Sequence, residues 1–204
     1  MDKAKKSIVR EIFEWILLVV AAFLIASLIQ SELFALTEVN MSSMYDTLVE
    51  GDKLIMNKLS YTFSKPGRGD IIIFLKDEPV NGAIGRASIY ITDIVKKLHG
   101  EFRRNRLIKR VIGVPGDEIE IRDNVLYVNG VEQKEAYATV DPFEDVVVNG
   151  TMKKITVPDG KYFVMGDNRG ESMDSRSFGV IDGSWIEGKA ILRILPFNKM
   201  GTLK

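Results

Sequence analysis

The fold class is set by residues 118–130, EIEIRDNVLYVNG, in which two short β-rich runs are joined by Asp123-Asn124 and followed by Asn129-Gly130. Asn-Gly between apolar runs is a strong signal for a tight hairpin turn. The stretch therefore predicts antiparallel strands that follow one another as a meander.

Similar runs, separated by turn residues, continue on both sides of this stretch. They occupy residues 53–56, 70–75, 107–114, 118–121, 125–128, 146–148, 155–157, 162–165 and 190–194. Asn149-Gly150 adds another hairpin signal, and the sequence contains no internal repeat. We expect a mainly β fold, built as an antiparallel β-sheet domain. Residues 89–98, IYITDIVKKL, are the exception, because helical and strand periodicities both fit them.

The N-terminal part is different in character. Residues 12–34 are apolar apart from Glu14, Ser27 and the polar residues at 30–32, and residues 15–29 contain no charge. This length suits a single membrane-spanning helix, with Trp15 placed as an interfacial anchor. A cleaved secretory signal or a buried core helix are the alternatives. Both fit less well, because the run is longer than a signal h-region and no Ala-x-Ala pair follows it.

Basic residues flank this segment on one side only. Lys3, Lys5, Lys6 and Arg10 precede it, whereas no lysine or arginine follows it before Lys53. Under the positive-inside rule, the N-terminus lies in the cytoplasm. We therefore expect a cytoplasmic segment at 1–11, a membrane anchor at 12–34 and an extracytoplasmic β domain at 35–204, in the cell membrane.

The composition limits the chemistry. The chain has 204 residues, of which 46% are hydrophobic, so one domain with its own core is expected. Lysine plus arginine equals aspartate plus glutamate at 28 each, and this balance offers no basic field for nucleic acid. The absence of cysteine excludes a thiol nucleophile, a thiolate metal site and disulfides. The zinc His-Glu-x-x-His motif, the aspartic-protease triplets and the Gly-x-Ser-x-Gly elbow are also absent.

A serine nucleophile could lie directly behind the apolar segment, in MSSMYDTL at residues 41–48. A serine hydroxyl needs a base, and the only histidine, His99, stands apart from any such motif. Lys109 is the candidate base, because it lies within the apolar run LIKRVIG (residues 107–113), where desolvation favours a neutral amine. Taken singly, the serine could be a turn residue and Lys109 a snorkelling strand lysine.

Four blocks together resemble the bacterial type I signal peptidases, in their short Gram-positive-like form. In order they are SMYDTL (43–48), GDII (69–72), KRVIG (109–113) and GDNRGESMDSRSFG (166–179). These membrane-bound serine proteases use a Ser/Lys dyad to remove signal peptides from exported preproteins, without metal or organic cofactor. By this resemblance, Ser43 is the nucleophile and Lys109 the general base. The partners that it implies are signal peptides, membrane lipid and the export translocon.

The resemblance also assigns supporting roles. Met44 follows the nucleophile, Ser172 would hydrogen-bond near the lysine amine, and Asp174 with Arg176 would form an ion pair that fixes the loop. Residues 167–169 would shape the same loop. The substrate would add as a β-strand between the strand leading to Ser43 and the strand of Leu107 and Ile108. Pockets for small side chains would favour an Ala-x-Ala sequence, and the residues expected along this path are Met41, Ser42, Leu107 and Ile108.

The chain departs from the family pattern at three places. Asp46 stands where a proline usually precedes the threonine, which predicts a looser turn. Met41 stands where a small or hydroxyl residue usually assists the oxyanion hole. Residues 76–106 are longer than the connection that most relatives need, so we treat them as an insertion of unassigned function.

Two other functions are compatible with parts of this sequence. A self-cleaving repressor domain shares the Ser/Lys chemistry, but it would carry a DNA-binding module where this chain has an apolar segment. A signal-peptidase-like assembly factor for surface pili would bind secreted subunits without cutting them. The presence of both Ser43 and Lys109 favours the peptidase, while Asp46 and Met41 keep the assembly factor as an alternative.

Overall fold

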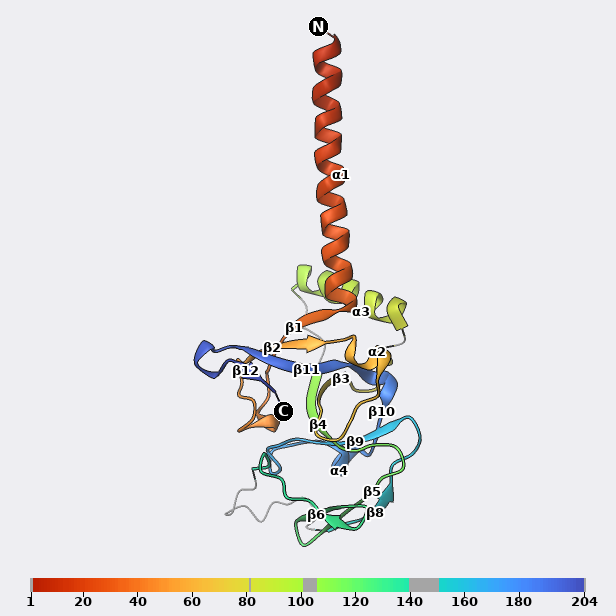
Figure 1. The fold of residues 1–204 in the computed structure, drawn as a ribbon, viewed down its shortest axis with the longest axis vertical. Coiled ribbons are helices and arrows are strands. Elements are labelled where there is room, and N and C mark those ends of the chain that lie inside the picture. Colours follow the sequence, from red (N-terminus) through yellow and green to blue (C-terminus); the bar gives the residue numbers. More distant parts are fainter. Residues whose placement is uncertain (1, 81, 101–105, 140–150, 204) are drawn as a thin grey trace.

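The computed structural model describes residues 2–80, 82–100, 106–139 and 151–203. Helix α1 (Asp2–Glu32) extends away from a β-rich body that begins where the helix ends (Figure 1). In the part of the chain that is described, no helix is both long enough and apolar enough to cross a membrane. The anchor expected at residues 12–34 stays a prediction.

Eight strands form the larger sheet, in the order β1-β2-β11-β3-β4-β9-β10 with β12 beside β11. All pairings described within it are antiparallel, so the predicted mainly β, antiparallel fold is confirmed. The strands are β1 (Phe34–Glu38), β2 (Lys53–Asn57), β3 (Ile71–Leu75), β4 (Arg106–Gly113), β9 (Lys161–Met165), β10 (Ile181–Asp182), β11 (Ile186–Leu195) and β12 (Gly201–Thr202).

Strand β3 lies at the centre of the larger sheet and is buried at every residue. Ile71 and Ile73 pack in one apolar cluster, whereas Ile72 and Phe74 pack in another. Successive side chains of a strand point to opposite faces, so both faces of the sheet are covered here. This explains the unbroken apolar run. In the register with β4, Ile72 lies opposite Lys109.

A smaller antiparallel sheet has the strand order β7-β6-β5-β8. Asp123, Asn124, Asn129 and Gly130 all have positive φ, between 48° and 77°, as tight hairpin turns of the primed types require. The predicted meander is thus confirmed over this stretch. Its strands are β5 (Glu118–Arg122), β6 (Val125–Val128), β7 (Val131–Glu132) and β8 (Met152–Thr156).

The ambiguous residues 89–98 are helical and belong to α3 (Gly82–Leu98). Ile89 is buried against Leu75 and Val80, which docks the helix beside the end of β3. The short helices are η1 (Ser42–Met44), α2 (Ser60–Phe63), α4 (Ser175–Phe178), η2 (Gly183–Trp185) and η3 (Phe197–Lys199). Strands β1, β7, β10 and β12 were not predicted as separate elements. The strand expected at 146–148, the Asn149-Gly150 turn and part of the predicted insertion, residues 101–105, lie outside the described residues.

Candidate active site

Residues 41–48 contain the predicted nucleophile and are called the nucleophile turn here. Apolar side chains of this turn anchor it to the body. Met44 and Leu48 are fully buried in the cluster that contains Ile71 and Ile73. Met41 has an extended backbone, and the following three residues form the single turn η1. Ser43 is therefore held at the start of a short helix whose first internal hydrogen bond runs from Tyr45 N to Ser42 O. That bond leaves the Ser43 N–H unused by the helix itself.

Lys109 reaches the same point from β4. Its side chain is buried, with 1% of the residue exposed, and Nζ donates a hydrogen bond to Ser43 Oγ over 2.5 Å. Burial lowers the pKa of Lys109 from 10.5 to about 8, against the opposing effect of the negative charge on Asp174. A large fraction of the amine is therefore neutral in mildly alkaline solution.

The neighbouring Arg110 is also buried and pairs with Asp167. Arg110 Nε and Nη2 contact the two carboxylate oxygens at 2.9 and 2.7 Å, and Nη1 donates to Gly69 O. Thr47 Oγ1 donates to the same carboxylate at 2.6 Å. Asp167 thus links the nucleophile turn to β4, because its carboxylate binds Thr47 in the turn and Arg110 in the strand. The sequence signal for this link was a second cation inside an apolar strand, which needs a buried partner.

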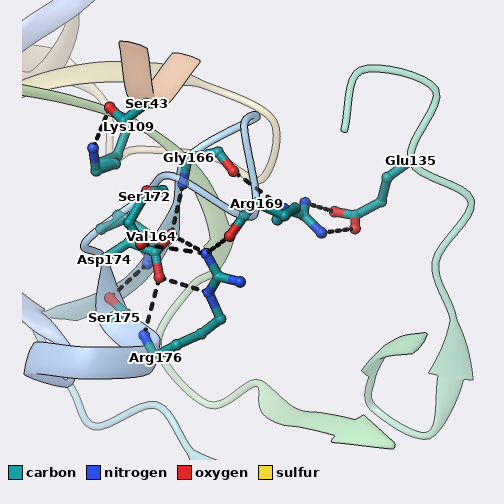
Figure 2. A network of polar contacts seen from close by, with 10 residues as sticks. All are labelled: Ser43, Lys109, Glu135, Val164, Gly166, Arg169, Ser172, Asp174, Ser175 and Arg176. Atoms are coloured by element: carbon teal, nitrogen blue, oxygen red, sulfur yellow. Dashed lines mark hydrogen bonds and ion pairs between the residues drawn. The ribbon is translucent and has the colours of Figure 1, made fainter. Parts of the chain in front are cut away.

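The loop that follows β9 is held by Asp174 (Figure 2). Its carboxylate accepts hydrogen bonds from Arg176 Nε and Nη2, both at 2.8 Å, and from Gly166 N at 3.0 Å. Burial alone would raise the pKa of Asp174, but the hydrogen bonds and charge of Arg176 outweigh this effect and keep the pKa below its usual range. Arg176 also donates to Arg169 O, so the ion pair closes the loop on itself.

Gly166 brings this loop against the nucleophile turn. A Cβ at this position would collide with Ser43 O and with Ser172 Oγ, so only glycine fits without movement. Asn168 N donates to Ser43 O at 3.1 Å, and Asn168 Nδ2 donates to Ser42 O at 3.3 Å. The backbone of Ser42 and Ser43 is thus held by the loop.

Ser172 lies close to this contact but makes no bond to the amine. Its Oγ is buried and makes no hydrogen bond of good geometry within the described residues, although it lies near enough to Asp174 to help keep the pKa of that carboxyl low. Since an unpaired buried hydroxyl is unfavourable, this atom is poised to accept or donate a bond if the neighbouring groups move. Figure 2 places Ser172 between the Ser43 and Lys109 pair and Asp174.

A comparison with known protein families identifies the family of this chain. Residues 12–195 match the model of the family described as signal peptidase, peptidase S26. The chain belongs to this family. The type of enzyme predicted from the sequence, a type I signal peptidase, is thereby confirmed.

Individual relatives match nearly the whole chain. All of it aligns with 95% of a protein named signal peptidase I T from Bacillus subtilis (strain 168), at 35% identity. Signal peptidase IB from Staphylococcus aureus (strain COL) is 31% identical over 93% of each chain. A crystal structure of a signal peptidase I from Enterococcus faecalis V583 covers 62% of this chain and 97% of its own, with 32% identity and a TM-score of 0.41.

The ion pair between Arg169 and Glu135, which the sequence did not predict, links the loop of residues 166–179 to another segment of the chain. Arg169 contacts the Glu135 carboxylate at 2.5 and 2.7 Å, and its Nε donates to Gly166 O. Glu135 comes from the segment after β7, far along the chain, and it carried no local signal. Figure 2 shows the pair extending the network to that segment.

Asp46 has a specific contact in the structure. Its carboxylate accepts a hydrogen bond from Thr139 Oγ1 at 3.0 Å, and Thr139 N donates to Asp167 O. Asp46 therefore connects the nucleophile turn to Thr139. The absence of the proline usual in the family had predicted a looser turn, and this contact restrains it. An open cavity of about 460 Å³ lies beside this contact, lined by Asp46, Thr47, Ala136, Tyr137, Ala138 and Thr139.

The residues predicted to bind substrate lie on strand β4 or next to Ser43. Strand β1 pairs on one side with β2, and β4 pairs through residues 106–110 with β3. Strand β9 pairs with β4 only from Arg110 onward, so in the described residues the second edge of Leu107 and Ile108 has no strand partner. Met41 and Ser42 continue from β1 into η1.

No group of three or more His, Asp or Glu side chains that could hold a metal ion occurs among the described residues.

Proposed function

We propose that the chain is a membrane-anchored serine endopeptidase that cleaves signal peptides from exported preproteins, with Ser43 as nucleophile and Lys109 as general base. The observation that carries this proposal is the 2.5 Å contact between Lys109 Nζ and Ser43 Oγ, with Lys109 buried and its pKa lowered to about 8. The names of the relatives supply the substrate class, signal peptides.

In the reactive form Lys109 is neutral and takes the proton of Ser43 while Oγ attacks the scissile carbonyl. The protonated Lys109 then gives this proton to the departing amine of the mature protein, which leaves an acyl ester on Ser43. A water molecule, deprotonated by Lys109, hydrolyses the ester and restores the hydroxyl. The Ser43 N–H, at the start of η1, is placed to stabilise the oxyanion formed in both steps.

The supporting residues act on the dyad through position and charge. Asp174 and Arg176 fix the loop that presses Gly166 against Ser43. Ser172 would bond to the lysine amine during the reaction, because its buried Oγ lies near the dyad and is unpaired. Met44 holds the turn through its burial in the core.

The substrate would bind as an extended strand along the edges of β1 and β4. The unpaired edge at Leu107 and Ile108 offers backbone groups for such a strand, and Met41 and Ser42 would flank its scissile bond. Small pockets along this path would give the Ala-x-Ala preference. We expect the export translocon to present the substrate at the same membrane face.

The proposed anchor is residues 12–34, with residues 1–11 in the cytoplasm and 35–204 outside. Support comes from α1, whose large apolar side chains between Ile8 and Ile25 are exposed on a helix that stands apart from the body (Figure 1). Exposed apolar surface of this extent is unfavourable in water and favourable in lipid. The lysines and arginine before the segment support an N-terminus on the cytoplasmic side.

Cleavage of a purified preprotein by the reconstituted full chain tests the proposal. We expect Ser43→Ala and Lys109→Ala each to abolish cleavage and leave a folded protein, since the two groups act as one unit. Ser42→Ala is the matched control and should cleave normally. A chain that binds secreted subunits but never cuts a preprotein would favour the pilus assembly factor instead.

A further inference from the structure

Helix α3 displays a stripe of exposed apolar side chains that the proposed chemistry does not use. Ile84, Ile91, Val95 and Leu98 are 87%, 60%, 46% and 80% exposed. Their spacing of seven, four and three residues places all four on one side of a helix with 3.6 residues per turn. The stripe is therefore a continuous apolar face of α3 and not a set of scattered side chains.

The opposite side of α3 is attached to the β body. Ile89 is buried with Leu75 and Val80. Asp93 accepts a hydrogen bond from Arg106 Nη2 at 2.6 Å, and Arg106 Nε also contacts Glu187 of β11 at 2.5 Å. Since Arg106 begins β4, the strand of Lys109, the orientation of α3 is linked to the dyad by this ion-pair network.

The position of α3 indicates what covers the stripe. Figure 1 shows α3 lying across the lower end of α1, and the two helices contact each other. Phe34 and Leu36 of β1, at the same junction, are also exposed. Exposed apolar side chains of α3 and β1 thus lie beside the end of α1 that joins the body.

We infer that α3 is an interfacial membrane helix, whose stripe of Ile84, Ile91, Val95 and Leu98 lies in the outer boundary of the lipid bilayer. The inference rests on the proposed anchor, since a helix that crosses the end of a spanning helix lies along the membrane surface. Amphipathic helices bind there with the apolar face in the acyl boundary and basic residues toward the headgroups. Lys96 and Lys97, in the last turn of α3, provide the basic residues.

This second attachment has a consequence for catalysis. A single spanning helix leaves the domain free to rotate and tilt about its junction, whereas α3 adds a contact at a distance from that junction. Through Arg106, the contact sets the orientation of β4 with respect to the membrane surface. The edge of Leu107 and Ile108 is then held where a membrane-inserted signal peptide emerges.

The absence of cysteine from the sequence allows single-label measurements on the full chain. Ile91→Cys probes the stripe, Lys97→Cys is the matched control on another side of the same helix, and Leu18→Cys probes the anchor. Each variant carries an environment-sensitive fluorophore and is reconstituted in phosphatidylcholine and phosphatidylglycerol vesicles that contain spin-labelled lipid. We expect lipid quenching of the labels at positions 91 and 18, and at least about threefold weaker quenching at position 97.

The outcomes separate the two proposals. Quenching at position 18 with equal, weak quenching at 91 and 97 overturns the inference about α3 and leaves the anchor intact. No quenching at position 18 overturns the anchor, and the inference fails with it. Protection of position 91 that depends on protein concentration and not on lipid would identify the stripe as a contact between two copies of the chain, which also overturns the inference.

A functional measurement adds an independent test. We expect the double variant Ile91→Ser with Val95→Ser to cleave a membrane-inserted preprotein several-fold more slowly than the unmodified chain, and to cleave a short soluble peptide at the same rate. Val131→Ser, which replaces an exposed apolar side chain of the smaller sheet, is the matched control and should be slowed much less with the preprotein. Equal loss on both substrates would count against a membrane role for the stripe.

Discussion

Lys109 Nζ and Ser43 Oγ are 2.5 Å apart although 66 residues separate them in the sequence. Strand register and core packing create this contact. Lys109 is fixed because β4 pairs with β3, and Ser43 is fixed because Met44 and Leu48 are buried beside it. The Lys109 amine is therefore held in a buried site before any substrate arrives.

The first prediction concerns activity and pH. Only the neutral amine of Lys109 can accept the Ser43 proton, and burial lowers the pKa of Lys109 to about 8. We expect kcat/KM on a short peptide to rise about tenfold per pH unit below pH 8 and to level off above it. A profile measured from pH 6 to 9 checks this, and a flat profile with chemistry rate-limiting would contradict a titrating lysine base.

The second prediction concerns stability and pH. The pKa of Lys109 is 10.5 when the chain is unfolded and about 8 when it is folded, so the unfolded state binds the proton more tightly. The cost to folding is complete below pH 8, at about 3 kcal/mol, and is lost as pH rises from 8 to 10.5. Lys109→Met should therefore exceed the original chain in stability at pH 7 and lose this advantage by pH 10.5, as measured by urea unfolding. A stability advantage that does not change with pH would contradict a lowered pKa of Lys109.

The third prediction concerns Gly166. Alanine there would force apart the loop and the nucleophile turn, because its Cβ collides with Ser43 O and Ser172 Oγ. We expect Gly166→Ala to lose about 1–3 kcal/mol of stability, typical of overpacking, and most of its activity. Gly201→Ala is the control, since nothing lies within 4 Å of the added Cβ. Full activity of Gly166→Ala would show that this close contact is not needed.

The fourth prediction concerns Ser172. If its unpaired Oγ bonds to the Lys109 amine during the reaction, Ser172→Ala should lower kcat at least tenfold and shift the pH profile. The same variant should lose little stability, because the buried hydroxyl that it removes makes no hydrogen bond of good geometry. Denaturation and pH-rate measurements on one preparation distinguish the two effects. Loss of stability with an unchanged pH profile would mean that Ser172 is structural only.

The fifth prediction concerns topology. Protease added outside intact cells should reach the domain after residue 34, while a tag at Met1 stays protected. Removal of residues 1–34 should slow cleavage of membrane-inserted preproteins and leave cleavage of a short peptide largely unchanged, because the anchor supplies proximity only. An accessible tag, or equally fast processing of inserted preproteins by the truncated chain, would refute the anchor.

Some features follow from the sequence because their signals are local. The turns at Asp123-Asn124 and Asn129-Gly130 need residues that accept positive φ, and strands β5 and β6 were predicted within one residue of their ends, whereas the short β7 was not predicted. Residues 89–98 stayed ambiguous, because short apolar runs fit a helix and a strand equally well. In the structure these residues are helical, and Ile89 packs against Leu75 and Val80.

The sequence by itself determined the β meander, the family and the two residues proposed as the dyad, since each depends on residue type and order along the chain. Only the tertiary structure decided how these residues are held. The links of Asp167 to Thr47 and Arg110, of Glu135 to Arg169 and of Asp46 to Thr139 join segments far apart in the sequence. No local pattern records such partners, because a buried charge can be matched by any opposite charge or donor that the folded chain brings within hydrogen-bond distance.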